Sequence, residues 1–172
     1  MLNGLLIAVI VAMKYGLPAL LPRFPFAAGW ANFVLDTVDG DLLIPLGLSD
    51  PVYQNIDKSA DYVTYVFMIV ASRSWPMRKA LLVFFGIRTV GQALFFLTHK
   101  EIVFFFFPNF LEPMFLGYAT IRVFAKEGAP SFYRKHIVAI WAIVFLYKFQ
   151  DEWITHVGNI DRSETIARLW PF

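Results

Sequence analysis

The chain has 172 residues, of which 58% are hydrophobic and only 16% are charged, whereas soluble domains are usually about half apolar and a quarter charged. The formal net charge of +2 and the scattered basic residues exclude a charge pattern typical of nucleic-acid binding. The absence of cysteine excludes disulfides, thiolate catalysis and cysteine-based metal sites. The composition therefore predicts an integral membrane protein.

Six apolar segments follow one another along the chain, and no separate soluble domain fits between them. They are predicted at residues 2–21, 25–40, 57–71, 77–97, 101–124 and 132–153. A bilayer-spanning helix needs ~20 apolar residues, a length that the second and third segments reach only when their aspartates are included. The prediction is one all-α, multi-pass domain over residues 1–172, a bundle of about six transmembrane helices.

Two connecting or terminal stretches carry polar breaks. Residues 41–56 include Pro45 and Pro51 and predict a turn-rich loop; only in the alternative without a metal site would Asp57 cap the next helix. Residues 158–172 predict a polar break and a short amphipathic helix at the membrane interface.

Six of the eight aspartates of the chain fall between residues 36 and 61. Asp36 and Asp39 are three residues apart, and Asp57 and Asp61 are four apart, so each pair shares one face of its helix. Because four carboxylates in a partly dry site repel one another, they must be protonated or neutralised by cations. Oxygen ligands without cysteine or histidine suit Mg²⁺, Mn²⁺ or Ca²⁺. The sequence predicts a site for divalent ions, and the simpler alternative is a solvated loop with helix caps.

The same residues resemble the signature of the CDP-alcohol phosphotransferases, the membrane enzymes that make phospholipids, which reads D-x2-D-G-x2-A-R-x8-G-x3-D-x3-D. The first positions fall on Asp36, Asp39 and Gly40, the last two fall on Asp57 and Asp61, and the matched region covers about residues 25–68.

This resemblance implies a six-helix membrane fold with two Mg²⁺ or Mn²⁺ ions held by the four aspartates. Asp61 would also be the base that deprotonates an acceptor alcohol, and Gly40 would lie at the nucleotide. The implied reaction transfers a phosphatidyl or phospho-alcohol group from a CDP-linked donor to the alcohol and releases CMP.

Three positions depart from that signature. Its Ala-Arg pair falls on Leu43 and Ile44, and its second glycine falls on Tyr53, all in the part that shapes the nucleotide pocket. Two alternatives therefore stay open: an active phosphotransferase, or a non-catalytic subunit that packs or binds lipid in a larger membrane complex. Membrane lipids are expected partners in both, with a homodimer or a larger assembly.

Single charges inside the apolar segments need partners. Arg88 lies in the middle of the fourth segment, where a charge usually faces the bundle interior, and it predicts either a phosphate contact or an ion pair with Glu112. For Lys14 we expect either that its side chain snorkels to the membrane interface or that the first helix is shorter than its apolar segment. Asp151 and Glu152 predict the solvated end of the last helix.

Overall fold

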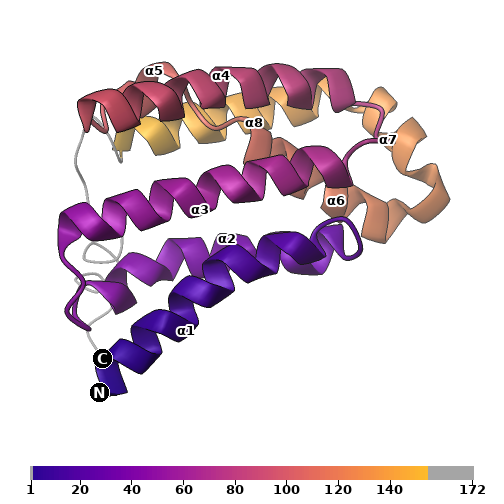
Figure 1. The fold of residues 1–172 in the computed structure, drawn as a ribbon. Helices are drawn as coiled ribbons and strands as arrows, with labels where there is room; N and C mark the ends of the chain where they lie inside the picture. The colour runs from indigo at the N-terminus through magenta and orange to yellow at the C-terminus, as the bar shows by residue number, and fades with distance from the viewer. Residues whose placement is uncertain (1, 155–172) are drawn as a thin grey trace, which may run out of the picture.

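The computed structural model describes residues 2–154, which are mostly helical and contain no β-strand within that range (Figure 1). The longer helices are α1 (Leu2–Gly16), α2 (Pro25–Leu43), α3 (Asp50–Ala71), α4 (Arg78–Thr98), α6 (Leu111–Ala125) and α8 (Ile137–Glu152). The shorter ones are η1 (Leu17–Leu20), α5 (Val103–Phe106), η2 (Lys126–Gly128) and α7 (Ala129–Lys135). The predicted all-α class is confirmed, and the amphipathic helix predicted at residues 158–172 lies outside the described residues.

The connection between α2 and α3 is shorter than the loop predicted for residues 41–56. Helix α2 continues to Leu43 and α3 already begins at Asp50. Pro51 lies in the first turn of α3, where a missing N–H costs no hydrogen bond and the fixed φ suits the helix. Asp57 therefore lies about two turns inside α3, and the alternative in which it caps that helix is wrong.

The fifth and sixth predicted segments are each interrupted. Pro108, which has no N–H to donate, lies between α5 and α6, and His136 separates α7 from α8. Within residues 2–154, two helical stretches, Leu2–Leu20 and Arg78–Thr98, are long and apolar enough to cross a membrane. Six membrane spans therefore stay a prediction.

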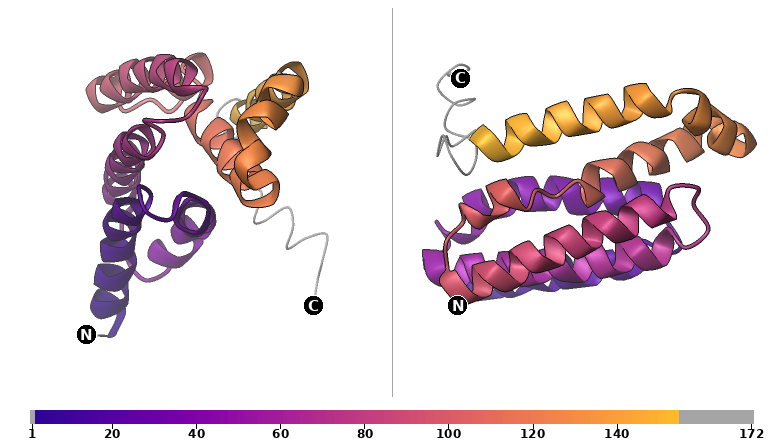
Figure 2. Two further views of the ribbon diagram at one scale, coloured as in Figure 1. Left: turned by 90° about the vertical axis from the view of Figure 1, so that its right-hand side faces the viewer. Right: turned by 90° about the horizontal axis from the view of Figure 1, so that it is seen from above.

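Helix α6 packs against α2, α3, α4 and α8 and organises the core. Figure 2 shows the chain from α1 to α4 on one side of the end-on view and the orange α6 to α8 region on the other. Trp75 stacks on Phe115 with ring centroids 4.7 Å apart, and Phe110 meets Phe145 edge-on at 4.5 Å. Such aromatic pairs add ~0.5–1.5 kcal/mol each beyond their buried area. They fix α6 against its neighbours and so position the polar residues at its start.

Large apolar side chains also lie on the outside of the bundle. Examples on α4, α6 and α8 are Leu97, Phe124 and Val138, which are 78%, 78% and 79% exposed. Helix α1 shows the same pattern. The buried side chain of this helix is that of Lys14, whereas the apolar side chains of Leu2 and Leu5 are exposed. Helices that are apolar on their outer faces are typical of proteins that meet lipid or other chains.

Candidate functional site

Three of the four predicted aspartates come together between α2 and α3. One carboxylate oxygen from each of Asp36, Asp39 and Asp57 lies within 4.8 Å of the other two. The two aspartates of α2 share one face because they are three residues apart, and α3 supplies the third. Asp39 and Asp57 are buried, whereas Asp36 is partly exposed. These three carboxylates are called the aspartate triad below.

The ammonium group of Lys14 lies among the carboxylates of the aspartate triad. Its Nζ donates hydrogen bonds to Asp36 Oδ1 at 3.1 Å, to Asp57 Oδ1 at 2.5 Å and to Asp39 Oδ2. Lys14 is only 4% exposed, so the expectation that it snorkels to the interface is wrong. An ammonium has three N–H donors and no acceptor, which matches three carboxylate oxygens that would otherwise repel one another.

The second oxygens of the two buried aspartates also have partners. Tyr53 Oη donates to Asp39 Oδ1 at 3.0 Å, and Lys58 Nζ donates to Asp57 Oδ2 at 2.6 Å. A set of carboxylates suits a hard divalent cation in its chemistry. The space that such an ion would need is filled by the ammonium of Lys14, so the residues as arranged do not fit a metal ion. The predicted Mg²⁺ or Mn²⁺ sites therefore stay a prediction.

Two of the three departures from the phosphotransferase signature, Leu43 and Tyr53, have structural roles. The ring of Tyr53 lies against Gly40, because a β-carbon built on that glycine would stand 2.9 Å from Tyr53 Oη. Leu43 is fully buried, and Ile44 follows the last residue of α2 with an exposed side chain. The tyrosine therefore covers Gly40, the position that the resemblance assigns to the nucleotide.

Asp61 lies one turn beyond Asp57 in α3 and outside the aspartate triad. Its Oδ2 accepts a hydrogen bond of 3.4 Å from Tyr65 Oη. Asp61 faces a polar cavity of about 150 Å³. The cavity is lined by Asp36, Lys58, Asp61, Tyr65, Arg88, Asn109, Glu112, Lys148, Asp151 and Glu152. Three of the four predicted ligands thus surround Lys14, and the fourth, Asp61, faces a polar cavity that shares only Asp36 with the aspartate triad.

Arg88 points its guanidinium toward this polar cavity from α4. Its carbon Cζ lies 4.0 Å from the centre of the Phe104 ring, and Nη1 donates to the carbonyl oxygen of Phe107 at 3.2 Å. The predicted ion pair with Glu112 is not formed in the described part of the chain, where Asn109 Nδ2 instead donates to Glu112 Oε2 at 3.1 Å. The buried Nε of Arg88 has no hydrogen-bond partner within residues 2–154. The alternative, a phosphate contact by Arg88, stays a prediction.

A buried network at the start of α6 and the end of α8 was missed by the sequence analysis. The backbone N–H of Asn109 donates to Glu152 Oε1 at 3.1 Å, and Lys148 Nζ lies 2.6 Å from Asp151 Oδ2 and 3.1 Å from Glu152 Oε1. Glu152 is only 2% exposed, so its predicted place at a solvated helix end is wrong. The available signal was Pro108, since a helix break releases backbone groups that then need side-chain partners.

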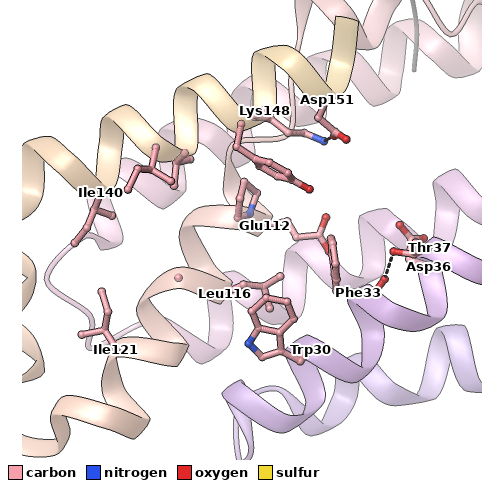
Figure 3. A pocket seen from close by; sticks show the side chains of 15 residues that line it. Trp30, Phe33, Asp36, Thr37, Glu112, Leu116, Ile121, Ile140, Lys148 and Asp151 are labelled. Carbon is pink, nitrogen blue, oxygen red and sulfur yellow. Dashed lines mark hydrogen bonds and ion pairs between the residues drawn. The ribbon is translucent and has the colours of Figure 1, made fainter. Parts of the chain in front are cut away.

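A larger groove opens beside the polar cavity, between α2, α6 and α8, with a volume of about 650 Å³ (Figure 3). One end is polar and the rest is apolar, as Figure 3 shows. The polar end is formed by Asp36, Thr37, Glu112, Lys148 and Asp151. The apolar length is formed by Trp30, Phe33, Pro113, Leu116, Gly117, Ile121, Ile140, Ile143, Val144 and Tyr147. We call this feature the α2–α6–α8 groove.

Comparisons with known proteins supply no relative: no family model, no curated protein and no solved structure matches the chain. The resemblance to the phosphotransferases therefore depends on the signature within residues 25–68 alone. The features of the molecule that bear on function are the aspartate triad, the polar cavity and the α2–α6–α8 groove.

Proposed function

We propose that this chain is a multi-pass membrane protein that binds a phospholipid in the α2–α6–α8 groove. The observation that carries the proposal is a groove of about 650 Å³ that is apolar along its length and charged at one end. Ligand sites are typically concave spaces of ~300–1,000 Å³ with mostly apolar walls and a few polar groups. A groove with one charged end matches an amphiphile rather than a uniformly polar or apolar molecule.

The length of the groove fits one leaflet of a bilayer. Along α6 it extends from Glu112 at the polar end to Ile121, which corresponds to about 14 Å at 1.5 Å per residue. The hydrocarbon core of a bilayer is ~30 Å thick, so one leaflet contributes ~15 Å. An acyl chain can therefore lie along the apolar walls while the head group stays at the polar end. The exposed apolar side chains of α4, α6 and α8 are consistent with lipid around the bundle.

The charges at the polar end favour a zwitterionic head group. Asp36, Glu112 and Asp151 supply carboxylates, and Lys148 supplies one ammonium, which is already paired with Asp151. A primary ammonium on the lipid would meet carboxylates, and the adjacent phosphate would meet the lysine, which gives charge-assisted hydrogen bonds on both sides. A purely anionic head group would lack the first of these contacts, so we expect an ethanolamine head group to be preferred over glycerol.

Photo-crosslinking tests this function. The full chain is placed in vesicles that contain phosphatidylethanolamine with a diazirine on one acyl chain, and the labelled residues are mapped by mass spectrometry. We expect labels on groove residues of α6 and α8 such as Gly117 and the largely buried Val144. Labelling confined to outward-facing residues such as Leu97 and Phe124 would overturn the proposal.

A matched pair of variants isolates the groove. A β-carbon on Gly117, which lines the groove, meets no atom within 4 Å, and the same holds for Gly86 on the outer side of α4. Gly117→Trp should fill the groove and remove most of the labelling, whereas Gly86→Trp should leave it unchanged. Glu112→Gln keeps an oxygen for Asn109 but removes the charge, so it should reduce the preference for ethanolamine over glycerol lipids.

A second candidate, a CDP-alcohol phosphotransferase, is favoured by one specific arrangement. Asp61 and Arg88 line the same buried polar cavity, and Asp36 joins that cavity to the groove. In this proposal Asp61 takes the proton of the acceptor alcohol and Arg88 contacts a phosphate of the CDP-linked donor. The reaction further requires Lys14 to leave the aspartate triad, so that its carboxylates can hold Mg²⁺ or Mn²⁺.

CMP release from CDP-diacylglycerol tests the second candidate. The purified full chain is assayed with Mg²⁺ or Mn²⁺ and common alcohol acceptors, and Asp61→Asn should abolish the release. Absence of metal-dependent CMP release by the unmodified chain would reject the enzyme and leave lipid binding as the function. The expected homodimer or larger assembly also stays a proposal, which the mass of the protein in detergent, measured by light scattering, tests directly.

A further inference from the structure

We propose that the Lys14 ammonium takes the place of a divalent cation in the aspartate triad, so that docking of α1 and binding of a divalent cation there exclude each other. Nζ of Lys14 donates to an oxygen of each of the three aspartates. These are the same three residues whose oxygens lie close enough to share one ion. One position therefore serves either cation, and the chain itself supplies the one that fills it.

The charges of the group support this exchange. The triad carries three negative charges, and Lys14 and Lys58 contribute two positive ones through their ion pairs. Withdrawal of Lys14 leaves two uncompensated negative charges in a largely buried site, which is costly. One divalent cation would cancel that excess. Carboxylate oxygens without sulfur or imidazole ligands would favour Mn²⁺, Mg²⁺ or Ca²⁺.

The attachment of α1 makes its release feasible. Lys14 is the buried residue of this helix, and apolar side chains such as Leu5 and Val9 are exposed. The other side-chain hydrogen bonds that join α1 to later helices or loops are exposed. Tyr15 Oη contacts Ser59 Oγ at 2.5 Å and donates to Ile56 O at 3.3 Å, and Asn3 Nδ2 donates to Leu46 O at 3.4 Å. Docking of α1 therefore depends strongly on the contact that a cation would replace.

Manganese binding by the full chain in detergent tests the proposal. Mn²⁺ alone is the probe, and the concentration of free Mn²⁺ is measured by electron paramagnetic resonance. Lys14→Met vacates the position, and we expect it to bind Mn²⁺ at least about tenfold more tightly than the unmodified chain, a difference of ~1.4 kcal/mol. Lys58→Met is the matched control, because it removes a positive charge from Asp57 but leaves Lys14 in place. It should change Mn²⁺ affinity much less.

Two further variants keep the proposal falsifiable. Asp39→Asn in the Lys14→Met background should remove the gain in affinity, which shows that Mn²⁺ binds at the triad. If Lys14→Met fails to fold, Lys14→Gln provides a neutral, polar replacement for the same comparison. Equal Mn²⁺ affinities for the unmodified chain and the folded Lys14 variant would overturn the proposal.

Amine labelling of the unmodified chain tests the exclusion without any variant. Lys14 should react with an acylating reagent far more slowly than the exposed Lys100 and Lys126. When Mn²⁺ is added at millimolar concentration, Lys14 should become reactive if Mn²⁺ binds at the triad. It should stay unreactive if Mn²⁺ does not bind there. Bound Mn²⁺ together with a fully protected Lys14 would contradict mutual exclusion. The inference does not depend on the ligand of the groove, so a failed lipid test leaves it standing.

Discussion

The hydroxyl oxygen of Tyr53 lies 2.9 Å from the point that a β-carbon on Gly40 would occupy. The same hydroxyl donates a hydrogen bond to Asp39 Oδ1 at 3.0 Å. The glycine of α2 and the tyrosine of α3 therefore fit each other, and together they fix one buried carboxylate of the aspartate triad. This pairing gives a structural reason for glycine at position 40, because the bulky ring of Tyr53 fills the space that a side chain there would need.

Gly40→Ala should destabilise the protein by ~1–3 kcal/mol, because the new methyl group forces the Tyr53 ring away from its packed position. Gly86→Ala is the control, since a β-carbon there meets no atom within 4 Å and alanine is the better helix former by ~1 kcal/mol. The free energy of unfolding in detergent, from denaturant titration followed by circular dichroism, measures both. Equal effects of the two substitutions would show that Tyr53 does not lie over Gly40.

Tyr53→Phe should cost ~1–3 kcal/mol, since a hydrogen bond to a buried carboxylate is lost while the oxygen stays buried. In a double-mutant cycle with Gly40→Ala, the two effects should be clearly non-additive, because the removed hydroxyl is the atom that meets the added methyl. Strictly additive losses would mean that residues 40 and 53 are not in contact.

Gly91→Ala should be more damaging than Gly40→Ala. A β-carbon on Gly91 would stand 2.6 Å from the Cβ atom of Phe107, and a Cβ atom can move only with its backbone. We expect a loss of at least ~1–3 kcal/mol and a weaker contact between α4 and the break that precedes α6. Thermal unfolding in detergent, compared with the Gly86→Ala control, measures it, and an unchanged melting temperature would place Phe107 elsewhere.

Lys14→Met should destabilise the chain by ~3–5 kcal/mol, because removal of one partner leaves buried charges without compensation. The exposed Lys100 is the control, and Lys100→Met should change stability by no more than ~0.5 kcal/mol. Both are measured by unfolding in detergent without added divalent cations. A Lys14→Met variant as stable as the control would mean that the ammonium does not neutralise the triad.

Much of the fold could be predicted from the sequence because hydropathy marks helices well. The starts of α2 and α4, at Pro25 and Arg78, agree within one residue with the predicted apolar segments. The start of α3 was predicted seven residues too late, since Pro45 and Pro51 were both assigned to a loop. Proline is common both in β-turns and in the first turn of a helix. The structure places Pro51 in the first turn of α3.

The site could be predicted in part, because spacing places residues on a helix face but does not choose their partners. Asp36 and Asp39 lie together because they are three residues apart on one helix. Asp57 joins them because the next helix lies alongside. The partner of this group, Lys14, lies more than 20 residues away in the chain. In the hydropathy pattern it is only a charged residue that interrupts the first apolar segment, so no partner was predicted for it. The rule that a charge within an apolar segment pairs inside the bundle was applied to Arg88 and would have been right for Lys14.

The occupant of the aspartate triad decides whether Lys14 takes the place of a divalent cation. An anomalous difference map from crystals of the unmodified chain grown with MnCl₂ identifies that occupant directly. We expect no manganese peak between Asp36, Asp39 and Asp57, with the ammonium of Lys14 at hydrogen-bond distance from all three carboxylates. A manganese peak at that position with the ammonium of Lys14 still at hydrogen-bond distance from the three carboxylates, or a triad that holds neither cation, would contradict the account.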